Sequence, residues 1–154
     1  MAYSSSSLVK STGGVQVKIK SNADKFFDAI ANSTKLFPTA VPSLYSSIST
    51  SNEDIGVRYI TYGEDCSRIK ESEEEINVKN PSIFSYSVLS GDILKYYASF
   101  CGEISVVSNE EGTWAKWTWE ADLPKANKPL DIEVELEELA VKTLGKLDEY
   151  LVRA

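Results

Sequence analysis

The order of the predicted elements indicates an α+β protein whose antiparallel sheet carries its helices on one face. An alternating segment, 14–21, opens the chain, a run of about six strand-like segments follows from residue 45, and a long amphipathic pattern ends it over 131–154. Because strands and helices are segregated along the chain, an antiparallel sheet is favoured over repeated βαβ units. The 154 residues suit a single domain, 1–154, in which we expect the serine-rich residues 1–7 to be flexible.

The first segments predict one strand and two short helices. Residues 14–21 alternate apolar and polar side chains, which is typical of a half-buried strand. Ser21 or Asn22 can cap a helix that begins near Ala23. The segment 36–44 contains two prolines, so at most a second short helix fits there before the chain turns.

The middle of the chain predicts strands, and its end predicts one helix. The expected strand regions are a hairpin about the Asn52–Gly56 turn, then 67–80, 82–91, 96–107 and 112–124. The segment 131–154 repeats apolar residues at spacings of three and four, which gives a helix with one apolar stripe: Ile132, Leu136, Leu139, Ala140, Leu144, Leu147 and Leu151.

Three tryptophans lie within the expected strand 112–124. Successive side chains of a strand point to opposite faces, so Trp117 and Trp119 share one face with Ala115. Trp114 falls on the other face, which we expect to be partly exposed. Two large rings beside small residues suit the wall of a ligand site.

Composition narrows the class of partner and the compartment. With 16 basic and 23 acidic residues the net charge is −7, which disfavours nucleic acid and anionic membranes as partners. The N-terminus has no signal-peptide pattern, and no apolar run approaches the roughly 20 residues of a membrane span. Two cysteines make no disulfide framework. We therefore expect a cytoplasmic protein.

The absence of histidine limits the chemistry that the chain can perform. It excludes Ser-His-Asp and Cys-His catalysis and removes the commonest zinc ligand, and the sequence contains no nucleotide-binding glycine motif. We expect neither a metal nor a cofactor. The acidic run Glu71, Glu73, Glu74 and Glu75 is more typical of a solvated face, although alternation can place a desolvated carboxylate, a possible general base, on the inner side.

Several stretches resemble the major latex protein branch of the plant superfamily typified by the major birch pollen allergen, the pathogenesis-related class ten proteins. They are LFP at 36–38 followed by Pro42, YSVLSGDILKYYASF at 86–100, and GTWAKWTWEADLP at 112–124. The resemblance covers nearly the whole chain. It implies a helix-grip fold, in which a seven-stranded antiparallel sheet wraps a long C-terminal helix with two short helices and encloses a large apolar cavity. The chain departs from the family at 51–57, where a glycine-rich loop is usual and only Gly56 is present, so the cavity mouth is expected to differ.

Given the resemblance, the inward-facing apolar residues of the expected strands become candidates for a ligand site. From the residues alone a dry packed core is favoured, whereas the family implies a hollow interior. Two phenols, Tyr59 and Tyr86, are the candidates for catalysis because they can orient a carbonyl or an enol, although bonds to backbone or water are the commoner use. The predicted ligand-binding residues are Ile30, Phe37, Val57, Tyr59, Phe84, Tyr86, Val88, Phe100, Ile104, Ala115, Trp117, Trp119, Leu136 and Ala140.

The resemblance also supplies the expected function. We expect the protein to bind a small hydrophobic plant metabolite and to assist the cofactor-independent cyclisation or isomerisation of an iridoid or terpenoid enol or an alkaloid. The alternative is a non-catalytic carrier, storage or hormone-binding protein for apolar ligands. A possible further partner is the upstream biosynthetic enzyme, and a monomer or weak dimer is expected.

Overall fold

A computed structural model describes residues 8–50, 56–79, 83–124 and 130–153 of the chain. Its helices are α1 (Ala23–Ala31), α2 (Ser33–Ala40) and α3 (Leu130–Arg153), with a short 3-10 turn η2 (Asp92–Lys95). Its strands are β1 (Leu8–Ile19), β2 (Tyr45–Thr50), β3 (Val57–Tyr62), β4 (Glu71–Lys79), β5 (Ile83–Gly91), β6 (Ser99–Asn109) and β7 (Gly112–Pro124).

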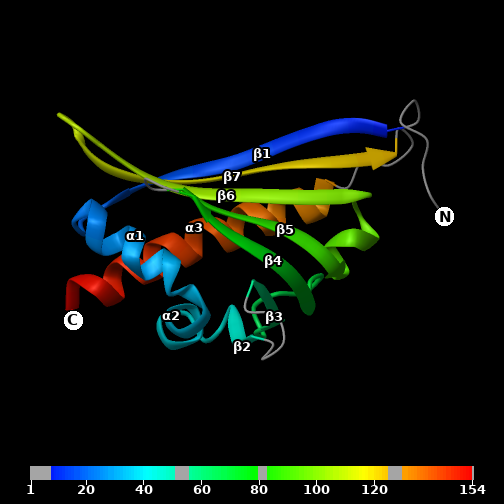
Figure 1. Cartoon of the computed structure of the whole chain (residues 1–154), viewed down its shortest axis with the longest axis horizontal. Helices are drawn as coiled ribbons and strands as arrows, with labels where there is room; N and C mark the ends of the chain where they lie inside the picture. Colours follow the sequence, from blue (N-terminus) through cyan, green and yellow to red (C-terminus); the bar gives the residue numbers. More distant parts are fainter. Residues whose placement is uncertain (1–7, 51–55, 80–82, 125–129, 154) are drawn as a thin grey trace.

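The seven strands form one antiparallel sheet that curves over α3 (Figure 1). The strand order is β1-β7-β6-β5-β4-β3-β2, so the first two strands of the chain form opposite edges of the sheet. The short helices α1 and α2 connect these edges and lie at the end of the sheet where the chain terminates (Figure 1). The predicted α+β helix-grip architecture is therefore confirmed. Residues 1–7 and most of the expected Asn52–Gly56 turn lie outside the described residues.

The ends of the elements follow local chemistry. Asn22 caps α1, because its side-chain oxygen accepts hydrogen bonds from the backbone N–H groups of Asp24 and Lys25 at 2.9 and 3.2 Å. The strand β1 begins at Leu8, before the predicted 14–21, because it pairs with β7 along its whole length. The strand β6 begins at Ser99, after the predicted start at residue 96, because the backbone N–H groups of Tyr96 and Tyr97 bond back to the carbonyl of Ile93 in η2.

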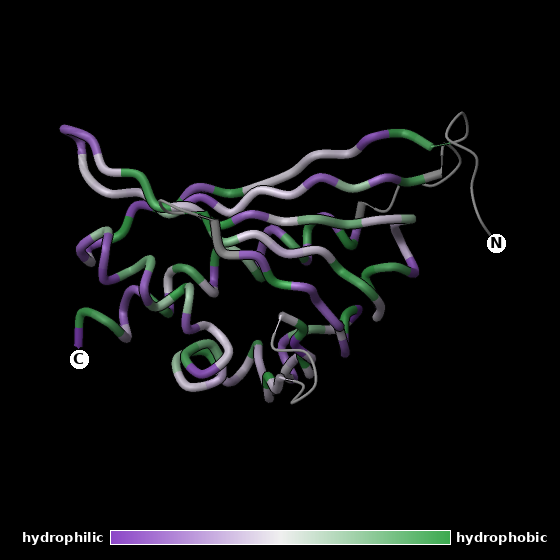
Figure 2. The backbone as a smooth tube through the Cα atoms, viewed as in Figure 1, coloured by the Kyte–Doolittle hydropathy of each residue, from purple (hydrophilic) through white to green (hydrophobic). Residues whose placement is uncertain are grey.

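The core lies between the sheet and α3. Apolar and polar positions interleave along the strands and along α3 (Figure 2), so that one face of each element is buried. In β7 the buried side chains are Ala115, Trp117, Trp119, Ala121 and Leu123. Trp114 is half-buried on the outer face, where the Lys18 ammonium lies 5.7 Å from the centre of its ring.

The C-terminal half of α3 is tied to the corner between β1 and α1. The Asp148 carboxylate accepts hydrogen bonds from the backbone N–H groups of Lys20 and Ser21, both at 2.9 Å, and from the Ser21 hydroxyl at 2.6 Å. The Lys25 ammonium donates to the carbonyl of Leu151 at 3.1 Å, near the helix end. These contacts hold α3 beneath the sheet.

Candidate functional site

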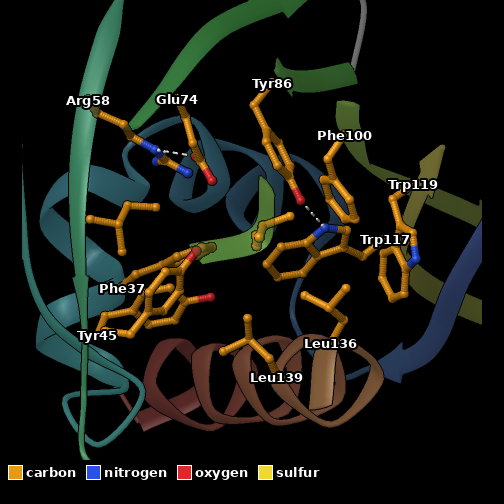
Figure 3. A pocket seen from close by; sticks show the side chains of 13 residues that line it. Phe37, Tyr45, Arg58, Glu74, Tyr86, Phe100, Trp117, Trp119, Leu136 and Leu139 are labelled. Atoms are coloured by element: carbon orange, nitrogen blue, oxygen red, sulfur yellow. Dashed lines mark hydrogen bonds and ion pairs between the residues drawn. The ribbon is translucent and has the colours of Figure 1, made fainter. Parts of the chain in front are cut away.

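An interior space lies between the inner face of the sheet and α3 (Figure 3). Its volume is about 20 Å³, which is room for about one water molecule. In this structure the space is thus far smaller than the large cavity that the resemblance implies. Its lining residues are Phe37, Tyr45, Arg58, Ile60, Tyr62, Glu74, Tyr86, Ile93, Phe100, Trp117, Trp119, Leu136 and Leu139.

The predicted ligand-binding residues fall into three groups. Those that line the space are Phe37, Tyr86, Phe100, Trp117, Trp119 and Leu136. Those that are buried in the surrounding core without lining it are Ile30, Val57, Phe84, Val88, Ile104, Ala115 and Ala140. Tyr59 belongs to neither group. Contact of any of these residues with a ligand stays a prediction.

The inward placement of Tyr59 is wrong. Its side chain is 45% exposed, whereas Arg58, Ile60 and Tyr62 are buried and line the space. The sequence prediction placed Tyr59 inward on the same strand face as Val57, and it did not consider Arg58, because charged side chains are rarely buried unless they are paired. The alternation of Ile60 and Tyr62 was the signal for the correct face, and it also places Arg58 inside.

Arg58 is tolerated inside because Glu74 lies opposite it on β4. The two residues are direct neighbours across β3 and β4, and the Arg58 Nε donates to the Glu74 carboxylate at 3.0 Å. The Arg58 Nη1 donates to the Ser33 hydroxyl at 2.7 Å. Burial raises the pKa of Glu74, and the Arg58 charge partly opposes this rise. One carboxylate of the acidic run on β4, that of Glu74, thus lies in the wall of the interior space. The interpretation of the run as a fully solvated face does not predict this position.

Three phenols lie near this ion pair, and each is protonated at neutral pH. Burial raises the pKa of Tyr45, Tyr62 and Tyr86, and the nearby Glu74 carboxylate raises it further. The Tyr86 oxygen accepts a hydrogen bond from the Trp117 indole N–H at 2.9 Å (Figure 3), which leaves the phenol proton free to be donated. These groups can therefore orient a bound oxygen atom, and they are poor bases.

Gly102 positions the Tyr86 ring. It lies directly opposite Tyr86 in the pairing of β5 with β6, and a Cβ atom added there would come within 2.3 Å of the ring. The ring therefore lies across the bare backbone of β6, from which its hydroxyl reaches Trp117. Gly102 is thus a positioning residue for the phenol.

Replacing Gly102 with alanine is expected to lower the free energy of unfolding by about 1–3 kcal/mol, because the Tyr86 ring must move within a packed core. Urea unfolding followed by circular dichroism measures this loss. The matched control is Gly145→Ala in α3, where an added Cβ has no neighbour within 4 Å. The control should be stabilising by roughly 0.5–1 kcal/mol, and equal effects of both variants would contradict the positioning role.

A second hollow of about 250 Å³ lies on the other side of Leu139, between α3 and the loop 63–70. The Glu135 carboxylate closes the loop onto the helix, since it accepts from the Ser67 hydroxyl and from the backbone N–H groups of Arg68 and Ile69. Burial raises the pKa of Glu135, but these hydrogen bonds outweigh it and leave the pKa lowered. The side chain of Leu139 lines both spaces, so it separates the interior from this hollow.

A metal site and a membrane-spanning helix are both absent from the described parts of the chain. No group of three or more cysteine, aspartate or glutamate side chains there is placed to hold a metal ion. Within the same residues, no helix is both long and apolar enough to cross a membrane.

Comparisons with known proteins agree with this architecture. Residues 9–154 match the profile of the pathogenesis-related protein Bet v 1 family. MLP-like protein 423 of Arabidopsis thaliana is 36% identical over 146 residues, which are 90% of this chain and 92% of that protein. Ginseng major latex-like protein 151 from Panax ginseng superposes with a TM-score of 0.73 at 17% identity, over 90% of this chain and 94% of that one. Norcoclaurine synthase from Thalictrum flavum gives 0.78 at 14% identity, over 97% and 90%.

Proposed function

The chain belongs to the pathogenesis-related Bet v 1 family, and on this basis we propose that it binds a small hydrophobic plant metabolite between the sheet and α3. We further propose that it assists a cofactor-independent cyclisation or isomerisation of a reactive metabolite, such as an iridoid or terpenoid enol or an alkaloid. The observation that carries the proposal is an interior wall of aromatic rings that includes Tyr86, a phenol whose hydroxyl can donate a hydrogen bond to a bound substrate. One structural neighbour is a synthase, norcoclaurine synthase, which supports chemistry in a fold of this kind.

The chemistry proposed needs positioning more than strong acids or bases. Packing a flexible substrate against Trp117, Trp119 and Phe100 holds its reacting atoms close together, which lowers the barrier through orientation alone. The Tyr86 hydroxyl donates to a carbonyl or enol oxygen of the substrate, and Glu74 is the buried carboxylate near it. No step requires histidine, which the chain lacks.

Binding a metabolite requires the interior to enlarge. The described space of about 20 Å³ does not hold a ten-carbon compound, and a hollow of about 250 Å³ lies directly beyond Leu139, which lines both. Rotation of the Leu139 side chain, with outward movement of the loop 63–70, joins the two spaces. Glu135 is the residue whose hydrogen bonds must yield for that movement.

The catalytic proposal is tested by adding the protein to upstream enzymes that release unstable enol or iminium intermediates. We expect a changed product ratio or stereochemistry, and a fall in turnover of about tenfold or more for Tyr86→Phe, because the transition state loses a hydrogen bond. Tyr59→Phe is the control, since that phenol is on the outer face and should leave turnover unchanged. Unchanged product ratios across the panel would count against an enzyme.

A non-catalytic carrier is the second candidate, and one observation favours it. Two polar groups of the interior already have a partner within the protein, since the Glu74 carboxylate accepts from Arg58 and the Tyr86 oxygen accepts from Trp117. A carrier predicts saturable quenching of tryptophan fluorescence by an apolar ligand that is recovered chemically unchanged. A partner surface near 51–57 would suit a hormone-binding role, and residues 51–55 lie outside the described part of the chain.

A further inference from the structure

One end of the interior wall carries a buried ion pair that the rest of the apolar lining does not explain. Arg58 and Glu74 are 5% and 3% exposed, and both line the space on the side away from Trp117 and Trp119 (Figure 3). Burying two charges costs several kcal/mol per ion before their attraction is counted. A purely apolar ligand gains nothing from such a pair, so its presence in the wall points to a ligand with a polar group.

The hydrogen bonds of the pair are only partly satisfied within the described chain. A guanidinium has five N–H donors, and a carboxylate accepts on two oxygens. Among the described residues, Arg58 donates from Nε to Glu74 and from Nη1 to Ser33, and Glu74 accepts from Arg58 on Oε1. Donors on Arg58 and an acceptor, Oε2, on Glu74 thus remain for a group in the interior.

The charge balance of the pair decides which polar group fits. An anionic group would be attracted by Arg58 but repelled by Glu74 at a similar distance, and a cationic group would meet the reverse. Either ion would also lose its hydration in the apolar interior. A neutral hydroxyl loses little hydration, accepts from Arg58 and donates to Glu74 with the same oxygen atom.

We propose that Arg58 and Glu74 form a recognition site for a single neutral hydroxyl group on an otherwise apolar ring compound. The apolar rings of the ligand then lie against Trp117, Trp119 and Phe100 at the other side of the space (Figure 3). This inference rests on the proposed function, because it names the class of ligand for the same interior. It selects hydroxylated compounds over the parent hydrocarbons and over the corresponding acids.

The test uses four probes with one ring skeleton: p-menthane, menthone, menthol and p-menthane-3-carboxylic acid. Equilibrium dialysis of each against the full chain, followed by gas chromatography, gives four dissociation constants. We expect menthol to bind about tenfold more tightly than p-menthane, since hydrogen bonds to charged groups are the stronger kind. Menthone, which only accepts, should fall between them, and the acid should bind most weakly at neutral pH.

The double variant Arg58→Met with Glu74→Leu removes both charges at similar volume, and such replacements of a buried pair are often neutral or stabilising. In this variant p-menthane should bind as well as in the original protein, and the tenfold preference for menthol should disappear. The control is Glu73→Gln, which changes the neighbouring carboxylate of β4, where Ser90 donates to it in an exposed position. The preference should survive in that control.

The outcomes separate this inference from the proposed function. Binding of all four probes with equal strength leaves a hydrophobic ligand site standing and overturns the hydroxyl site. A menthol preference that persists in a folded double variant overturns it as well. Failure of every probe to bind contradicts the proposed function, and the inference falls with it.

Discussion

Replacing Arg58 with methionine is expected to lower the free energy of unfolding by about 3–5 kcal/mol. The substitution leaves the Glu74 carboxylate 3% exposed and without its counter-charge. It also removes the hydrogen bond that the buried Ser33 hydroxyl accepts from the Arg58 guanidinium. A loss of this size is a large fraction of the stability of a typical domain, and urea unfolding at neutral pH measures it.

The double variant Arg58→Met with Glu74→Leu is the control for this first prediction. With both charges gone, its stability should recover to within about 1–2 kcal/mol of the original protein, because no buried charge is left unpaired and only the Ser33 hydroxyl, orphaned in both variants, still lacks its donor. The contrast between the two variants distinguishes an unpaired charge from a simple loss of packing. A single variant that loses less than about 1 kcal/mol, or a double variant as unstable as the single one, would contradict the assignment.

The loss caused by Arg58→Met should depend on pH. Burial raises the pKa of Glu74 above 4.5 in the folded protein. The folded state therefore binds the proton of the Glu74 carboxyl more tightly than the unfolded state does. Ionisation of this carboxyl destabilises the fold increasingly as the pH rises from about 4.5 through the folded-state pKa. Without Arg58, which lowers the pKa, the rise is larger. The difference in stability between the two proteins should therefore shrink as pH falls from about 7 towards 4.5. Asp92 and Glu135, whose pKa values are lowered, weaken both proteins alike in acid.

The sequence predicted the fold well where one periodicity covers a whole element. The apolar stripe over 131–154 matches α3, Leu130–Arg153, and the alternation over 112–124 matches β7. Both elements bury one face along their full length, so the spacing of apolar residues within each segment is enough to predict its structure. The β4 prediction, 67–80, begins too early, because 63–70 is a loop held by Glu135 from the distant helix α3.

The candidate site was predicted less well, because its chemistry depends on contacts between distant strands. The position of Arg58 follows from Glu74, which lies opposite it only once β3 and β4 are in register. The volume of the interior depends on how Leu136 and Leu139 of α3 meet the aromatic rings of the sheet. Local periodicity assigns a residue to a face, but it contains no information about the space left between two faces.

Replacing Asp148 with alanine is the second large expected effect, a loss of about 3 kcal/mol in the free energy of unfolding. The carboxylate accepts three hydrogen bonds in a site where Asp148 and Ser21 are each 8% exposed. Without it, the backbone N–H groups of Lys20 and Ser21 lose their partners beneath α3. Hydrogen bonds to a charged acceptor are stronger than neutral ones, and buried donors left unpaired carry their full desolvation cost.

The neighbouring carboxylate provides the matched control for Asp148→Ala. Glu149 is on the same turn of α3 and pairs with Lys146 at 3.8 Å, with both side chains more than half exposed at 57% and 60%. Glu149→Ala makes the same change in charge at the same end of the helix, so any difference between the variants reports the buried hydrogen bonds. The control should lose less than about 0.5 kcal/mol. Equal losses in thermal unfolding would show that α3 is held by apolar packing alone, with no contribution from the Asp148 anchor.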